Sequence, residues 1–203
     1  MRKYLLLCLI GLLSWSSFAH SPNLSTTMLV EKSKGVWVLQ ISTSLTAFKQ
    51  EIRTHFKETP YQSPEEFQEM VLEHITNHLY LRFNGDTTIS LDKGIVKLGH
   101  ETVVVFEVKG IPEEIQSVFF KNTAFQDIHR NKGTFMLFKE GFLKDQFTIN
   151  NTNEHRLNLE VKGNQLIDTN INSASVFSPY LVFIILALFG SGFMIRRLFL
   201  KTN

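Results

Sequence analysis

The sequence predicts an α+β fold, built mainly from antiparallel β-sheet or sandwich, with an inserted pair of short helices and one C-terminal transmembrane helix. Three observations lead to this prediction. Short segments of alternating apolar and polar residues recur from residue 26 to residue 162. Two segments with helical periodicity interrupt them after the first pair of strands. A long apolar run begins near residue 180.

The N-terminal segment 1–19 has the features of a secretory signal peptide. Arg2 and Lys3 form a basic start, an apolar stretch follows, and small residues lead up to Ala19. Cleavage after Ala19 would make His20 the first residue of the mature chain. We therefore expect the protein to be exported.

The segment 179–200 predicts a transmembrane helix with a basic cytoplasmic tail. Residues 180–195 are almost entirely apolar, which is close to the shortest run that crosses a bilayer. The basic residues beyond this run are Arg196, Arg197 and Lys201. By the positive-inside rule, they keep the tail in the cytoplasm. We expect a single-pass protein of the inner (cytoplasmic) membrane, with domain 20–163 in the periplasm and a linker at 164–178.

The exported part is acidic and contains no cysteine. Five of the 21 basic residues belong to the two ends, which leaves 16 basic residues against 19 acidic ones. Such a domain, with no basic cluster, is not expected to bind nucleic acid. The only cysteine, Cys8, lies in the signal peptide, so the mature chain has no disulfide and no thiolate ligand. Lipid attachment at Cys8 is disfavoured, because the residues before it are not small.

The predicted strands follow one another along the whole domain. Alternation places the first two at 26–32 and 35–43, joined by a tight turn. Asn84 and Gly85 mark another hairpin. Further short β-rich segments are 80–91, 94–99, 102–110, 115–122, 134–141, 142–150 and 156–163. The many phenylalanines in these segments predict a packed β core or, where they interrupt the alternation, an exposed edge for a partner.

Two helices are predicted between the first hairpin and the later strands. Segment 45–56 has apolar residues at helical spacing and ends before a run of breakers. Segment 64–78 begins with Pro64, and Ser63 and Glu66 fit a capping box around that start. Both helices are expected to turn one apolar face toward the sheet.

Two histidines of the second helix form a candidate metal site. His74 and His78 lie one helical turn apart, on or beside the apolar stripe, so both rings should face the domain. If His20 begins the mature chain, its amine and ring could join them, and imidazole suits Cu or Ni. The alternative interpretation is structural, with His74 at the edge of the core and His78 ending the helix.

Other candidate sites are weaker. Segments 126–130 and 98–101 each join a histidine to a carboxylate, which could orient an imidazole or simply occupy a solvated turn. We find no nucleophile elbow and no phosphate-binding glycine loop. The sequence therefore predicts no catalytic residues and no organic cofactor.

The order of these parts resembles a known family of exported domains. The resemblance rests on the Ala-His start, the hairpin, the helical insertion and four segments. These segments are HLYLRFNGDTTISL, VVVFEV, KNTAFQDIHRNKGTF and the closing FTIN…RLNLEV. Over about residues 20–163, the chain resembles exported domains of unknown function from Gram-negative bacteria. That family is similar to the ectodomain of HupE/UreJ-type membrane proteins, which are thought to move nickel or cobalt. Those proteins have several membrane helices where this chain has one, so the resemblance does not imply transport.

We expect a non-enzymatic, membrane-anchored periplasmic interaction module whose partner is a membrane or periplasmic protein. The alternative is a metal-binding accessory domain for Cu or Ni that serves a transporter or a metalloenzyme.

Overall fold

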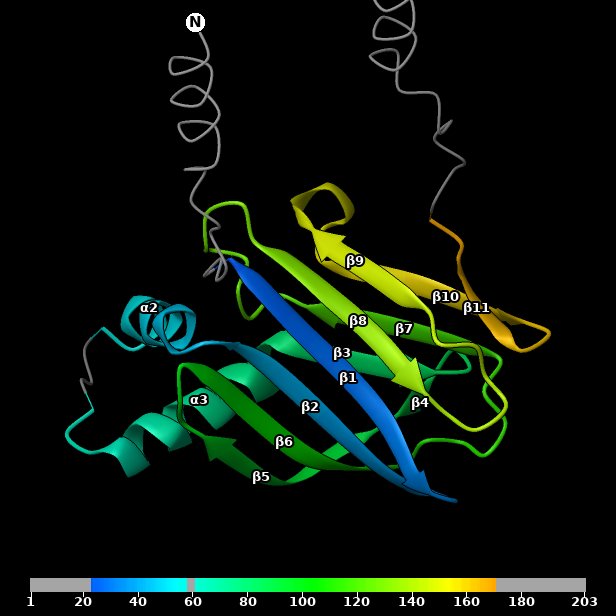
Figure 1. The fold of residues 1–203 in the computed structure, drawn as a ribbon, viewed down its shortest axis with the longest axis horizontal. Helices are drawn as coiled ribbons and strands as arrows, with labels where there is room; N and C mark the ends of the chain where they lie inside the picture. Colours follow the sequence, from blue (N-terminus) through cyan, green and yellow to red (C-terminus); the bar gives the residue numbers. More distant parts are fainter. Residues whose placement is uncertain (1–22, 58–60, 171–203) are drawn as a thin grey trace, which may run out of the picture. The chain divides into compact units, whose positions relative to one another are not determined.

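The computed structural model describes residues 23–57 and 61–170, which form two β-sheets and two α-helices (Figure 1). The strands of the first sheet are β1 (Leu24–Ser33), β2 (Val36–Ser44), β5 (Ser90–Lys97), β6 (Glu101–Lys109), β8 (Lys132–Phe138) and β9 (Gln146–Asn150). Those of the second sheet are β3 (Leu79–Phe83), β4 (Thr87–Thr88), β7 (Ser117–Asn122), β10 (Arg156–Lys162) and β11 (Gln165–Asp168). The helices are α2 (Leu45–His55) and α3 (Pro64–His78), and a short 3-10 turn, η1, spans Asn151–Asn153. The predicted mainly-β fold with two inserted helices is confirmed.

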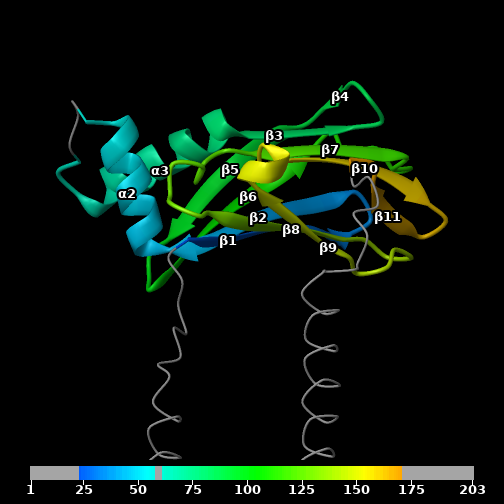
Figure 2. The same cartoon turned by 90° about the horizontal axis from the view of Figure 1, so that it is seen from above.

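The two sheets lie face to face and enclose the core (Figure 2). Strand order is β5-β6-β2-β1-β8-β9 in the first sheet and β11-β10-β7-β3-β4 in the second. Side chains alternate between core and surface along most of the strands, because successive residues point to opposite faces of a sheet. Strand β5 departs from this pattern at a bulge between Asp92 and Ile95. Phe120 of β7 stacks on Phe135 of β8 with ring centroids 4.2 Å apart, which joins the two layers. This arrangement is compatible with the expected sandwich.

The helices lie at one end of the sheets and add to the same core (Figures 1 and 2). The Phe48 ring of α2 meets the Phe125 ring edge-on at 5.1 Å between centroids. The chain of β5 passes close to α3 at Gly94, where an added Cβ would lie 2.6 Å from Leu72 and 2.7 Å from Phe106. A larger residue would therefore force the Leu72 and Phe106 side chains to move.

One pairing differs from the antiparallel arrangement that the sequence predicts. Strands β1 and β8 run parallel, with Met28 opposite Met136, while the other paired strands are antiparallel. The loop 123–131 returns the chain to the start of β1, where the Lys132 amide donates to the Asn23 carbonyl at 2.9 Å. This return allows β8 to run in the same direction as β1.

The folded domain extends beyond Gly163, the last residue of the predicted domain. Strand β11 lies inside segment 164–178, which the sequence predicts as a linker, and it pairs antiparallel with β10. Its Leu166 is buried, so this segment adds to the core.

The expected signal peptide, the start at His20 and the expected transmembrane segment 179–200 lie outside the described residues. Within the described residues, no helix is long and apolar enough to cross a membrane.

Candidate metal centre

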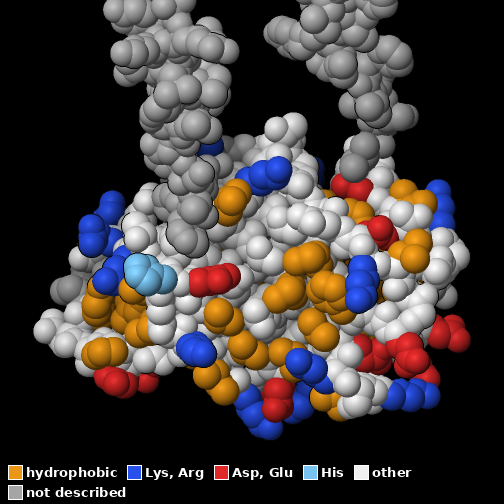
Figure 3. Space-filling model, in the orientation of Figure 1, with side chains coloured by type: hydrophobic (Ala, Val, Ile, Leu, Met, Phe, Trp, Pro, Cys, Tyr) orange, Lys and Arg blue, Asp and Glu red, His pale blue; other side chains and the backbone are white. Residues whose placement is uncertain are grey.

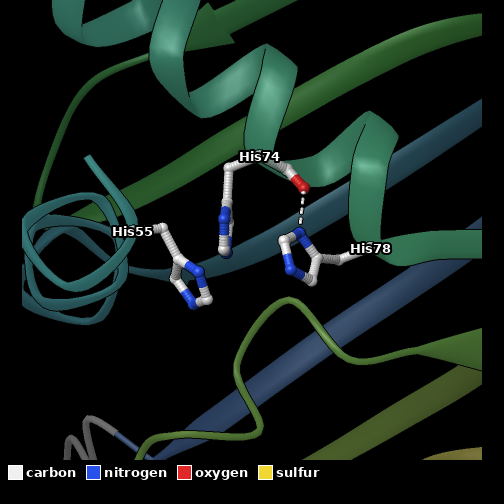
Figure 4. A group of neighbouring side chains, drawn as sticks. All are labelled: His55, His74 and His78. Carbon is white, nitrogen blue, oxygen red and sulfur yellow. Dashed lines mark hydrogen bonds between the residues drawn. The ribbon is translucent and has the colours of Figure 1, made fainter.

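Three histidine rings meet where α2 lies beside α3 (Figure 4). His55 ends α2, and His74 and His78 lie one turn apart at the end of α3. Ring centroids are 4.4 Å apart for His74 and His78, 4.9 Å for His55 and His74, and 5.1 Å for His55 and His78. One nitrogen from each ring can be chosen so that all three lie within 4.8 Å of one another. This spacing is short enough for one metal ion to bind three nitrogens.

The capping of the two helices fixes where these rings lie. The Ser44 side chain accepts a hydrogen bond from the Ala47 amide at the start of α2. The Ser63 hydroxyl accepts from the Glu66 amide at the start of α3, which is one half of the predicted capping box. The Glu66 carboxylate accepts from the amide of Gln62 rather than from that of Ser63. From these starts, helical periodicity places His55 on the same side of α2 as the buried Glu51 and Ile52, and its side chain remains 31% exposed.

His74 is a neutral ring with one buried lone pair. Its Nε2 lies 2.7 Å from the Ala124 carbonyl oxygen, which can only accept, so Nε2 carries the proton. The other nitrogen, Nδ1, is therefore an acceptor, and it has no hydrogen-bond partner in the described part of the chain. The residue is 1% exposed. Burial lowers the pKa of His74 to about 4, although the bond to Ala124 opposes this shift, so the ring is neutral at physiological pH.

His78 and His55 also have one nitrogen held by an acceptor. Nδ1 of His78 donates to the His74 carbonyl at 2.8 Å, which leaves Nε2 as the lone pair. Nε2 of His55 donates to the Asp127 carboxylate at 3.1 Å and lies 3.4 Å from a Glu51 carboxyl oxygen. This leaves Nδ1 of His55 as the nitrogen with the lone pair. Metal-bound histidines usually donate their second ring nitrogen to a carbonyl or carboxylate in this way.

Glu51 is the buried acidic group of this site. Its side chain is 1% exposed, and neither carboxyl oxygen has a hydrogen-bond partner within the described residues. Burial, reinforced by the charge of Asp127, raises the pKa of Glu51 to about 7. The site therefore combines three imidazoles with a buried carboxyl and a partly exposed carboxylate.

The donor set favours a transition metal that binds imidazole. It offers nitrogen and carboxylate ligands, and none of the described residues is a cysteine. Imidazole suits Cu, Ni and Zn. Three protein nitrogens leave room for a further ligand, which is typical of centres that exchange or use their metal.

The structure brings together two of the three histidines that the sequence proposes. His74 and His78 are adjacent, whereas His20 lies outside the described residues. The structural alternative is also present, since His74 borders the core and the Nδ1 bond of His78 closes the last turn of α3. Sequence reasoning missed His55 and Glu51. The available signal was their position beside the apolar stripe of α2.

Neither of the two weaker histidine–carboxylate pairs forms a side-chain bond among the described interactions. In segment 126–130, Asp127 contacts His55 rather than its neighbour His129. His100 is exposed in the turn between β5 and β6, Glu101 is exposed at the start of β6, and no side-chain bond joins them among the described interactions.

The chain matches no protein-family model, and no curated protein matches it. The case for a function therefore rests on the geometry of the site and on the features of the sequence.

Proposed function

We propose that this domain binds a divalent transition metal ion through His55, His74 and His78. The observation that carries the proposal is the Nδ1 atom of His74, a lone pair on a buried neutral ring without a hydrogen-bond partner in the described region. Leaving a buried polar atom unpaired costs about 1–3 kcal/mol. A metal ion at this position would remove that cost and would use the free nitrogens of the two neighbouring rings.

Copper and nickel are the proposed ions, because a set of imidazole nitrogens without a thiolate suits Cu²⁺ and Ni²⁺. Binding of Cu²⁺ is expected to be the tighter, since affinity rises from Ni²⁺ to Cu²⁺ for a given set of ligands. Zn²⁺ is expected to compete for the same nitrogens.

A titration of the purified full chain tests this function. The chain, kept in detergent and carrying a tag without histidine, is stripped with a chelator and titrated with Cu²⁺. We expect His78→Ala to weaken binding at least tenfold, because it removes one of three ligands. The matched control is His100→Ala, which removes an exposed imidazole from the β5–β6 turn and should bind as the wild type does. Equal binding by all three proteins would contradict the proposal.

We further propose that the chain presents this centre outside the cytoplasm, as a membrane-anchored accessory domain for a transporter or a metalloenzyme. The support comes from the sequence: the leader, the apolar run 180–195 with basic residues beyond it, and the resemblance to exported domains. Protease added to cells with an opened outer envelope should digest the domain and leave a C-terminal tag intact. Protection of the domain would contradict this topology.

Interaction with a protein partner is a second candidate function, and the outer face of the first sheet favours it. Figure 3 shows hydrophobic side chains gathered on the face where the first sheet lies. Its apolar residues, each only partly buried or exposed, include Met28, Val30, Val38, Ile95, Val105, Met136 and Phe138. The strand register places them next to one another, with Ile95 opposite Val105 and Val30 opposite Val38. Scattered single apolar residues are ordinary, but a contiguous group indicates a contact surface.

A photo-crosslinking residue tests this second function in cells. At position 95, where Ile95 is 66% exposed, the probe should give one discrete adduct with a partner protein. The matched control is Tyr80 of the second sheet, which is 53% exposed and should give none. The same adducts from both positions, or from neither, would argue against a specific surface.

A further inference from the structure

We propose that the centre holds two divalent cations, the second bound by Glu51, Asp127 and Nε2 of His55, with the His55 ring bridging the two ions. This inference rests on the proposed function, since the first ion is the one bound by the three histidines. It extends that function from a mononuclear site to a dinuclear one with two chemically different positions.

The geometry of the acidic side supports the second position. Nε2 of His55 lies 3.1 Å from an Asp127 oxygen and 3.4 Å from a Glu51 oxygen. One ligand atom from each of the three residues lies within 4.8 Å of the other two. Glu51 stands one helical turn before His55 on α2, and Asp127 comes from the loop 123–131, so two separate elements converge on the same ring nitrogen.

The buried carboxyl of Glu51 is an independent sign of a missing ligand. Its side chain is 1% exposed, and neither oxygen has a hydrogen-bond donor within the described residues. Buried carboxyl groups are normally paired, hydrogen-bonded or bound to a metal. The 3.4 Å approach to His55 Nε2 turns this carboxyl toward the proposed ion. A cation there would give the buried oxygens a partner that the described residues do not supply.

The bridging role of His55 follows from the two nitrogens of its ring. The acidic side uses Nε2 of His55, and the same ring has its centroid 4.9 Å from that of His74 and 5.1 Å from that of His78. Nδ1 is the nitrogen that remains for the ion of the three-histidine site. One imidazole therefore belongs to both groups of ligands.

Charge balance is favourable for two ions. When the second ion binds, the Nε2 proton of His55 leaves to solvent, and the ring becomes an imidazolate bonded to a metal at each nitrogen. Glu51 likewise binds as a carboxylate after releasing its proton. Imidazolate and two carboxylates then supply three negative charges against the four positive charges of two divalent ions. The mixed oxygen and nitrogen donors of the outer position suit Zn²⁺ as well as Cu²⁺.

The test measures how many Cu²⁺ ions the full chain binds, and whether their electron spins interact. We expect the wild type in detergent to bind two ions per chain and Asp127→Asn to bind the second at least tenfold more weakly, because an amide loses the charge of the ligand. Asp127 is partly exposed, at 44% of its side chain, so this variant should remain folded. The double variant Glu51→Gln, Asp127→Asn should bind one ion, and His100→Ala should bind two.

Electron paramagnetic resonance tests the bridge itself. Imidazolate couples two Cu²⁺ ions magnetically, so the wild type with two ions should show a reduced signal per copper, while the double variant shows the full signal of isolated Cu²⁺. One ion in both proteins would overturn the second position but leave the three-histidine function intact. Two ions with full, uncoupled signals in the wild type would overturn the bridge. Absence of any bound ion would overturn both proposals.

Discussion

Glu51 and His74 are expected to give the metal-free domain two opposite pH dependences of stability that cancel in the wild type. Burial raises the pKa of Glu51 from its ordinary value of 4.5 to about 7, with a smaller contribution from the charge of Asp127. Burial also lowers the pKa of His74 from its ordinary value of 6.5 to about 4. Both groups lie in the same site. Replacing one of them at a time separates their effects on the free energy of unfolding.

The sign of each contribution follows from which state binds the proton. Folded Glu51 keeps its proton to about pH 7, whereas the unfolded chain loses it near 4.5, so the free energy of unfolding falls as pH rises through this window. Unfolded His74 keeps its proton to about pH 6.5 and the folded one only to about 4, so here the free energy of unfolding rises with pH. At roughly 1.4 kcal/mol per pKa unit, each group contributes about 3 kcal/mol over its window.

Between pH 4.5 and 6.5, the folded and unfolded states bind the same number of protons at these two residues, so their contributions cancel. Glu51→Gln removes the contribution of Glu51, so the contribution of His74 is no longer cancelled. The free energy of unfolding of that variant should rise by roughly 1.4 kcal/mol per pH unit relative to the wild type over this range. His74→Gln should show the opposite slope.

Urea unfolding of the fragment 20–170, followed by circular dichroism at pH 4.5, 5.5 and 6.5 with a chelator present, measures these slopes. Glu101→Gln is the matched control, because Glu101 is exposed on β6. The free energy of unfolding of this variant should change with pH in parallel with that of the wild type. The difference between each variant and the wild type removes the contributions of all other titrating groups. A Glu51→Gln curve parallel to the wild-type curve would refute the reasoning about burial.

Three further predictions concern the core, the isolated domain and the N-terminus. Phe135→Ala should lower the free energy of unfolding by about 3–5 kcal/mol in urea titrations, because it removes a fully buried ring between the sheets. Phe138→Ala, on the outer face of the first sheet, should lower it clearly less. The fragment 20–170 should sediment as a soluble monomer with or without reductant, since it contains no cysteine; aggregation with intact β-structure would instead show that its apolar face needs a partner. If His20 supplies its amine and ring to the centre, a glycine placed before it should weaken Cu²⁺ binding at least tenfold in the processed full chain; unchanged affinity would exclude that role.

Most of the fold was predictable, because the signals are local. Alternation marks most of the strands, and Asn84 and Gly85 mark the β3–β4 turn with positive φ values of 50° and 88°. Ser63, followed by Pro64, marks the start of α3. The parallel pairing of β1 with β8 was not predictable, since the paired residues are about a hundred positions apart. Strand β11 was missed because its four residues are too few to show a period.

The site was predictable only where its residues lie on one helix. The spacing of His74 and His78 is enough to place both rings on one face. His55 meets them only through the packing of α2 against α3, which no local pattern encodes. Asp127 was paired with its sequence neighbour His129, whereas the loop turns it toward α2. The helical periodicity that places His74 beside the apolar stripe of α3 also places His55 beside the apolar stripe of α2, because His55 follows Ile52 at helical spacing.

The state of the centre depends on a chain of contacts that begins between the two sheets. Asn122, buried at the end of β7, donates to Thr27 of β1 at 3.3 Å and accepts from the Ala124 amide at 3.0 Å. Ala124 in turn presents its carbonyl to Nε2 of His74 at 2.7 Å. That carbonyl fixes the tautomer and so leaves Nδ1 as the lone pair. The two sheets thus do more than carry the helices, because their buried polar contact positions the carbonyl that determines which nitrogen of His74 keeps its lone pair.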